Sequence, residues 1–206
     1  MRAPTSLCLV LAVLAVSGSA LAAQRAFHVH GVPGYGISLS LPSGWRTVDS
    51  KHVLSPAQLQ ELEQENPELA GPLSAMSRPS SPVKFFAFDP ATRLGFATNV
   101  NVVVVSIGSG ITFDAYAKAL TAEISSLSSA SNMVVSRVTL PAGPAVRVSY
   151  RLRFTRGGTT RQTSTLQYGL LRNGNQSVVF TYTTLPQLQP VYAAVFATSA
   201  SSIRFG

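Results

Sequence analysis

The sequence predicts an α+β protein in which helices cover both faces of a mostly antiparallel sheet, an α/β/α sandwich. Several segments alternate apolar and polar residues with the period of two that marks a half-buried strand. In the second half, short turns rich in glycine and asparagine separate consecutive strands, which favours antiparallel hairpins. Three other segments carry apolar residues at helical spacing, and such stripes need a sheet face to cover.

The first 23 residues have the features of a Sec-type signal peptide. Arg2 gives a positive start, a short apolar run covers residues 6–16, and small residues at A-x-A spacing follow. We expect cleavage after Ala22 or Ala23. The apolar run is shorter than the ~20 residues that span a bilayer, so we expect no integral membrane span after cleavage. The protein should then be secreted or act in the cell envelope.

The cysteine content and the net charge indicate the compartment of the protein and the kind of partner that it can bind. The single cysteine, Cys8, would leave with the signal peptide, and no cysteine follows the apolar run as a lipid anchor requires. Export without disulfides is typical of a bacterial protein. The chain has 16 basic and 8 acidic residues, a formal charge of +8. Such a balance suits anionic partners, although export argues against nucleic acid.

Residues 24–33 are expected to be a flexible lead-in, and residues 34–206 a single domain. Gly34–Trp45 is the first strand. Ser55 and Pro56 are typical of a helix start, and leucines at helical spacing continue to Met76. We name this segment the acidic helix, because half of the acids in the chain lie on it: Glu61, Glu63, Glu65 and Glu68.

Two strands, 83–89 and 96–107, and the clearest helix follow. The valine run 102–105 predicts a central strand buried on both faces. Thr112 can cap the next helix, with Asp114 in its first turn. That helix has an apolar stripe at helical spacing: Phe113, Tyr116, Ala117, Leu120, Ile124 and Leu127.

The rest of the chain predicts four strands joined by turns and a last helix. The strands are 132–140, 145–154, 163–171 and 176–184, with hairpin turns at 156–160 and 172–175. The closing helix carries the stripe Leu188, Val191, Tyr192, Val195 and Ser199.

This ordered pattern resembles the PsbP-like and Mog1-like domain family. GYGISLSLPSGW is similar to its opening strand and turn, and ITFDAYAKALTAEISSL to its central helix. VTLPAGPAVRVSYR is similar to its strand–turn–strand, and NQSVVFTYTTLP to its closing strand. VKFFAFDPATRLGFATNVNVVVV is similar to exported actinobacterial proteins of the LpqN/LpqT type. The resemblance implies an α/β/α sandwich without catalytic machinery, in accessory or partner-binding proteins. LpqN-type proteins are commonly lipoproteins, and this chain departs from them in lacking the cysteine.

No constellation of residues predicts catalysis, a metal or a cofactor. His28 and His30 would share one face of a strand, but two ligands do not close a metal site. The glycine-rich stretch 107–112 is explained by a turn and a helix cap. The acids form no pair of the kind that glycoside hydrolysis needs. We therefore expect no enzyme and no cofactor.

The strongest candidate for a binding surface is the strand 145–154. Its apolar and polar residues alternate without error, so Arg147, Arg151 and Arg153 project from one face, and Arg156 follows. We call these four residues the arginine surface. It can be solvated, paired with the acidic helix, or bound to an acidic partner, because guanidinium groups suit carboxylates and phosphates.

The leading hypothesis is an exported, non-catalytic binding or accessory module that contacts another exported or envelope protein with an acidic surface. The alternative is a carrier of a small apolar ligand or lipid, held between sheet and helices near four phenylalanines, which plain core packing explains as well: Phe85, Phe86, Phe88 and Phe96. A carrier should contain a cavity of a few hundred Å³. A partner-binding module should be filled and display an exposed patch.

Overall fold

The structure is a computed structural model that describes residues 26–49, 80–156 and 159–206, together with positions 55, 57, 60, 64, 69, 73, 74, 76 and 78. The predicted signal peptide, residues 1–23, lies outside these residues. Within the described part of the chain, no helix has the length and apolar character needed to cross a membrane.

The described elements follow the predicted order, with additional short strands. The first half forms β1 (Phe27–Val32), β2 (Ile37–Pro42), β3 (Arg46–Asp49), β4 (Val83–Phe88) and β5 (Asn99–Ser106). The second half forms α3 (Phe113–Ser125), β6 (Ala130–Leu140), β7 (Gly143–Arg156), β8 (Thr159–Arg172) and β9 (Gln176–Thr184). The chain closes with a 3₁₀ turn, η2 (Pro186–Leu188), then α4 (Gln189–Ser201) and β10 (Arg204–Phe205).

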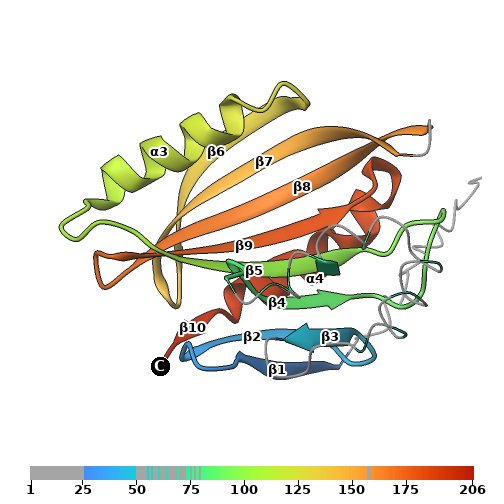
Figure 1. The fold of residues 1–206 in the computed structure, drawn as a ribbon, viewed down its shortest axis with the longest axis horizontal. Helices are drawn as coiled ribbons and strands as arrows, with labels where there is room; N and C mark the ends of the chain where they lie inside the picture. Colours follow the sequence, from blue (N-terminus) through green and yellow to red (C-terminus); the bar gives the residue numbers. More distant parts are fainter. Residues whose placement is uncertain are drawn as a thin grey trace, which may run out of the picture.

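The strands form two sheets in which all pairs are antiparallel, as predicted for the fold class. The large sheet has seven strands in the order β3-β4-β5-β9-β8-β7-β6, and the small sheet has three in the order β1-β2-β10 (Figure 1). The predicted hairpin turns are confirmed. Arg156 pairs with Thr159, and in the turn after β8 both Asn173 and Gly174 have the positive φ of a type I′ turn.

Helices α3 and α4 cover opposite faces of the large sheet. On β9, Val178, Phe180 and Tyr182 pack in the cluster that contains α4, whereas Val179 packs in the cluster of α3. Successive side chains of a strand point to opposite faces, so the two helices lie on different sides. The small sheet belongs to the α4 side, because Leu39 and Leu41 of β2 join the α4 cluster. This confirms the predicted sandwich of helices around a sheet.

The prediction of a flexible lead-in over residues 24–33 is wrong. From Phe27 to Val32 the chain forms β1, which pairs with β2 over its whole length, from Phe27 opposite Pro42 to Val32 opposite Ile37. The segment lacks the clean alternation of a half-buried strand, since Val29 is 73 % exposed and only Val32 is buried. Backbone pairing along the edge of β2, rather than burial of side chains, therefore holds it in place.

Most of the acidic helix lies outside the described residues, including Glu61, Glu63, Glu65 and Glu68. Two of its described leucines, Leu69 and Leu73, are buried and pack against Phe86 and Phe88 of β4. These phenylalanines alternate with Phe85 and Ala87, which belong to the α4 cluster. The leucines therefore cover the β3–β4 end of the same sheet face that carries α3.

Candidate functional site

A groove of about 560 Å³ lies between α3 and the large sheet. Helix α3 makes most of its contacts with β6, β7 and β8. The next strands of the sheet, β9 and β5, lie to one side of the helix (Figure 1). Val105 and Leu127, at 40 % and 42 % exposure, line the groove and show that it opens to solvent. We call this site the α3 groove. Its volume lies within the range of small-molecule sites.

Part of the floor of the α3 groove comes from β5, the one strand that the sequence predicted to be buried on both faces. Val100, Val102 and Val104 of β5 are buried on the α4 side. On the other side, Val103 is only half-buried and Val105 is exposed, and both line the groove. The two-face prediction for β5 is therefore wrong. The reason is the position of α3, which leaves this part of the sheet without a covering helix among the described residues.

The wall of the groove is one flank of α3. The predicted apolar stripe is confirmed for Tyr116, Ala117, Leu120 and Ile124, which are buried. Beside it runs a second stripe at i, i+4, i+8 spacing: Ala115, Ala119 and Glu123, all exposed and all lining the groove. Because two of these three residues are alanines, the helix does not fill the space beside it.

Gly169 on β8 allows α3 to lie close to the sheet. A Cβ at this position would come within 2.3 Å of Leu120 Cδ2 and 2.8 Å of Tyr116 Oη. Any larger residue would push the helix outward or displace these two side chains. The glycine therefore sets the distance between the wall and the floor of the groove.

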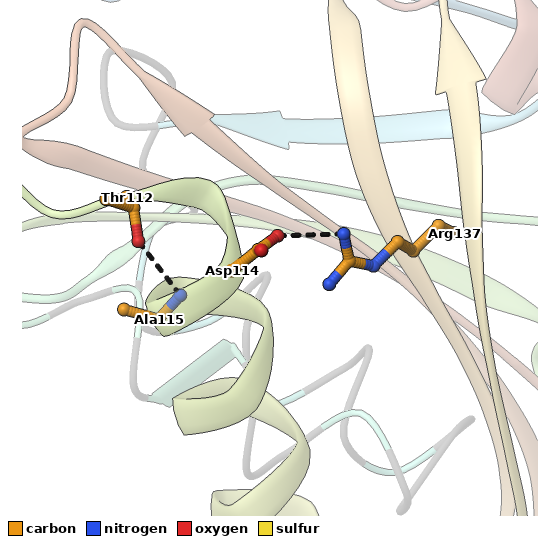
Figure 2. A network of polar contacts seen from close by, with 4 residues as sticks. All are labelled: Thr112, Asp114, Ala115 and Arg137. Carbon is orange, nitrogen blue, oxygen red and sulfur yellow. Dashed lines mark hydrogen bonds and ion pairs between the residues drawn. The ribbon is translucent and has the colours of Figure 1, made fainter.

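The N-terminal end of α3 is held by two contacts that Figure 2 shows together. Thr112 Oγ1 accepts a hydrogen bond from the backbone N–H of Ala115 at 3.2 Å, which confirms the predicted cap. Asp114, in the first turn, forms an ion pair with Arg137 of β6 at 2.8 Å. Both side chains of this pair are exposed, so its contribution to stability is small.

The polar groups of the groove gather around two tyrosines. Tyr116 Oη lies 3.0 Å from Ser177 Oγ of β9. Burial raises the pKa of Tyr116 to about 12; the hydrogen bond to Ser177 opposes this rise and the Glu123 carboxylate adds to it. Burial followed by Glu123 raises the pKa of Tyr150 to about 12 as well, against a hydrogen bond to Thr165. The carboxylate of Glu123 therefore acts on both hydroxyl groups.

Gln167 contributes a polar atom without a partner to the same site. Its Nε2 donates to Thr181 Oγ1 at 3.0 Å, and both residues line the groove. Its Oε1 is buried and has no hydrogen-bond partner among the described residues. A buried acceptor without a donor costs free energy, about 1–3 kcal/mol, so a donor that reached this atom would remove that cost.

The arginine surface lies on the opposite face of the sheet. Val146, Val148 and Tyr150 of β7 pack in the α3 cluster, so the alternating Arg147 and Arg151 face the α4 side, as predicted for one shared face. Arg147 and Arg151 are half-buried and Arg153 is exposed. Arg156 is the last residue of β7, and its side chain is outside what the structure describes.

The arginines have few polar partners among the described residues. Arg151 Nη2 donates to Gln189 Oε1 of α4 at 3.5 Å, and Arg151 Nη1 is buried without a partner there. None of Arg147, Arg151 and Arg153 forms an ion pair with a described acid. Pairing with the acidic helix stays a prediction, because its four glutamates lie outside the described residues.

The remaining candidates are structural. The four phenylalanines of the carrier hypothesis are at most 2 % exposed and belong to the core, which confirms plain packing: Phe85, Phe86, Phe88 and Phe96. His28 and His30 occur on β1, where burial and then the neighbouring His28 lower the pKa of His30. In the described part of the chain, no three His, Cys, Asp or Glu residues come together as a metal site would require.

Sequence reasoning missed the α3 groove and its polar residues, Glu123, Gln167, Ser177 and Thr181. The one signal in the sequence was the pair of alanines beside the apolar stripe of α3, which marks a helix flank with small side chains. The strand residues carried no such signal, because alternation alone does not reveal which part of a sheet face a helix covers.

The architecture defines an antiparallel α+β sandwich with a ligand-sized groove on one face. More narrowly, the fold is that of the PsbP/Mog1-like proteins, as the sequence resemblance predicted. No protein-family model matches the chain, and no curated protein matches it in sequence. Solved structures do match.

Three of these structures span almost the whole described fold. Cyanobacterial PsbP from Synechocystis has a TM-score of 0.55 at 16% identity, over 88% of this chain and 94% of its own. LpqN of Mycobacterium tuberculosis, involved in cell envelope biogenesis, has a TM-score of 0.53 at 13% identity, over 88% and 90%. The Ran-binding protein Mog1p of Saccharomyces cerevisiae has a TM-score of 0.50 at 8% identity, over 88% and 96%. At these identities the likeness concerns the fold.

Proposed function

We propose that the protein is a non-catalytic binding module that is exported to the bacterial envelope or beyond and holds a small apolar or amphipathic molecule in the α3 groove. The observation that carries this proposal is the groove itself, at about 560 Å³ with an apolar floor. A volume of this size suits a small-molecule site, and the groove differs from the expected interior cavity in opening to solvent along Val105 and Leu127. Similarity in fold to LpqN, a protein involved in cell envelope biogenesis, supports the envelope as the place of action.

The groove can be tested by filling it from the helix side. Ala119 is exposed and lines the groove, so Ala119→Trp should place an indole in the binding space. We expect this variant to lose binding of the uncharged fluorophore N-phenyl-1-naphthylamine, measured by fluorescence titration. Ala122→Trp is the matched control, because Ala122 is exposed on the other flank of the same helix. Equal binding by wild type and both variants would contradict the proposal.

Native mass spectrometry of the protein purified from its own cells gives an independent measurement. A carrier should release a bound small molecule from the wild-type protein and less of it from Ala119→Trp. Edman sequencing of the same material tests export, since cleavage of the signal peptide should leave Ala23 or Gln24 as the first residue.

The arginine surface supports a second function, binding of an exported or envelope protein with an acidic surface. The specific observation is that Arg147 and Arg151 share one face and that none of Arg147, Arg151 and Arg153 forms an ion pair with a described acid. The double variant Arg151→Glu, Arg153→Glu should keep its fold and lose partners captured by cross-linking in cells. If the double variant captures the same proteins as the wild type, the arginine surface is not the binding surface.

A further inference from the structure

The α3 groove is an acidic site on a basic protein. Among the described residues that line it, Glu123 is the one charged side chain, although the chain as a whole has a formal charge of +8. The basic residues near α3, Lys118 and Arg137, line the other flank of the helix. The arginine surface faces the opposite side of the sheet. A ligand in the groove therefore meets negative charge close by.

The polar end of the groove offers one charged acceptor and one buried acceptor without a partner among the described residues, beside side chains that already hydrogen-bond one another. Tyr116 Oη is already engaged with Ser177 Oγ, and the Nε2 of Gln167 is engaged with Thr181. The Glu123 carboxylate accepts hydrogen bonds only, and the buried Oε1 of Gln167 has no partner among the described residues. Both call for a ligand group that donates.

The rest of the lining is apolar and suits a hydrocarbon chain. Val103, Val105 and Val179 form the floor, and Ile107, Ile124 and Leu127 lie around it. The exposed side chains of Val105 and Leu127 mark the open side of the groove, where apolar surface now faces water. Covering this surface with an alkyl chain is favourable because it removes apolar area from water.

From this arrangement we infer that the α3 groove binds an amphiphile with a primary ammonium head group, whose alkyl chain lies on the valine floor and whose head is held by Glu123 and Gln167. The inference rests on the proposed function and names the ligand class of the same site. An ammonium group has three N–H donors and a positive charge, so it complements the Glu123 carboxylate in charge and can donate to an acceptor such as Gln167 Oε1. A carboxylate or sulfate head would instead face Glu123 with like charge.

The test compares three amphiphiles with the same alkyl chain, all below the concentration at which they form micelles. Decylammonium, decanol and decanoate compete at pH 7 for N-phenyl-1-naphthylamine bound to the wild-type protein. We expect decylammonium to displace the fluorophore at about tenfold lower concentration than decanol, as one charge-assisted hydrogen bond provides, and decanoate to be the weakest. In Glu123→Gln the preference for decylammonium over decanol should disappear, while decanol should bind as in the wild type. Asp114→Asn, which removes a charge from the other flank of α3, should leave the preference unchanged.

The possible outcomes separate the two proposals. If the fluorophore binds and the three amphiphiles displace it equally, or decanoate displaces it best, the ammonium inference is overturned and the binding function stands. If Glu123→Gln keeps the preference for decylammonium, the inference is also overturned, because the head group is then held elsewhere. If neither the fluorophore nor any amphiphile binds, the proposed function itself fails.

Discussion

The two faces of the large sheet differ in how completely they are covered, and valines of the same strand show it. Val102 is fully buried on the α4 side, whereas its neighbour Val103 is half-buried on the α3 side. On the α4 side, the helix and the small sheet together enclose Phe180, Tyr182 and Tyr192, which are at most 1 % exposed. On the α3 side, the helix covers β6 to β8 and leaves the floor of the α3 groove open. The groove on this face follows from missing cover rather than from a special residue type.

The largest expected effect is a difference in stability between the two valines. Val102→Ala removes buried methyl groups and leaves a cavity, so we expect a loss of about 2–3 kcal/mol in the free energy of unfolding. Val103→Ala should cost less than about 1 kcal/mol, because its side chain already borders the open groove. Urea denaturation of both variants measures the difference. Equal losses of unfolding free energy in the two variants would mean that the groove is closed in solution. The two faces of the sheet would then not differ in how completely they are covered.

The position of α3 is the next point to test. Gly169→Ala places a Cβ in contact with Leu120 and Tyr116, and such overpacking costs about 1–3 kcal/mol. We also expect weaker binding in the α3 groove, because the wall moves away from the floor. Gly108→Ala is the control, since a Cβ there meets nothing within 4 Å. If Gly169→Ala leaves both stability and binding unchanged, Gly169 does not set the width of the groove.

The smallest effect concerns the tyrosines beside Glu123. Their pKa values of about 12 exceed the ordinary value of 10.0. The neutral hydroxyls therefore contribute stability that is complete below pH 10 and is lost as the pH rises through about 12. Glu123→Gln should lower the pKa of Tyr116 and of Tyr150, as followed by NMR of the tyrosine ring carbons. The pKa of Tyr182, raised mainly by its burial on the α4 side, should not change. If the pKa values of Tyr116 and Tyr150 are the same in Glu123→Gln as in the wild type, the Glu123 carboxylate does not lie close to the two hydroxyl groups.

Most of the fold could be predicted because it depends on local patterns. Alternation along β7, the cap at Thr112 and the Asn-Gly turn after β8 are each encoded in a few neighbouring residues, and each is confirmed. The predictions that were wrong concern β1 and β5, whose structure depends on which other element lies beside them. β1 lacks a buried face and is held by pairing with β2, and β5 carries a valine run whose second face is left uncovered.

The sequence by itself determined the class of fold and the helix stripe of α3, because strand and helix periods translate directly into which side chains lie together. Only the tertiary structure decided where α3 lies on the sheet. Gly169 on β8 leaves room for α3 to pack closely on the sheet at that position. The strands on one side of the helix are left uncovered and form the floor of the α3 groove. Glu123 and Gln167, 44 positions apart in the chain, both line that opening because β8 passes beneath the helix, a relation that no local pattern contains.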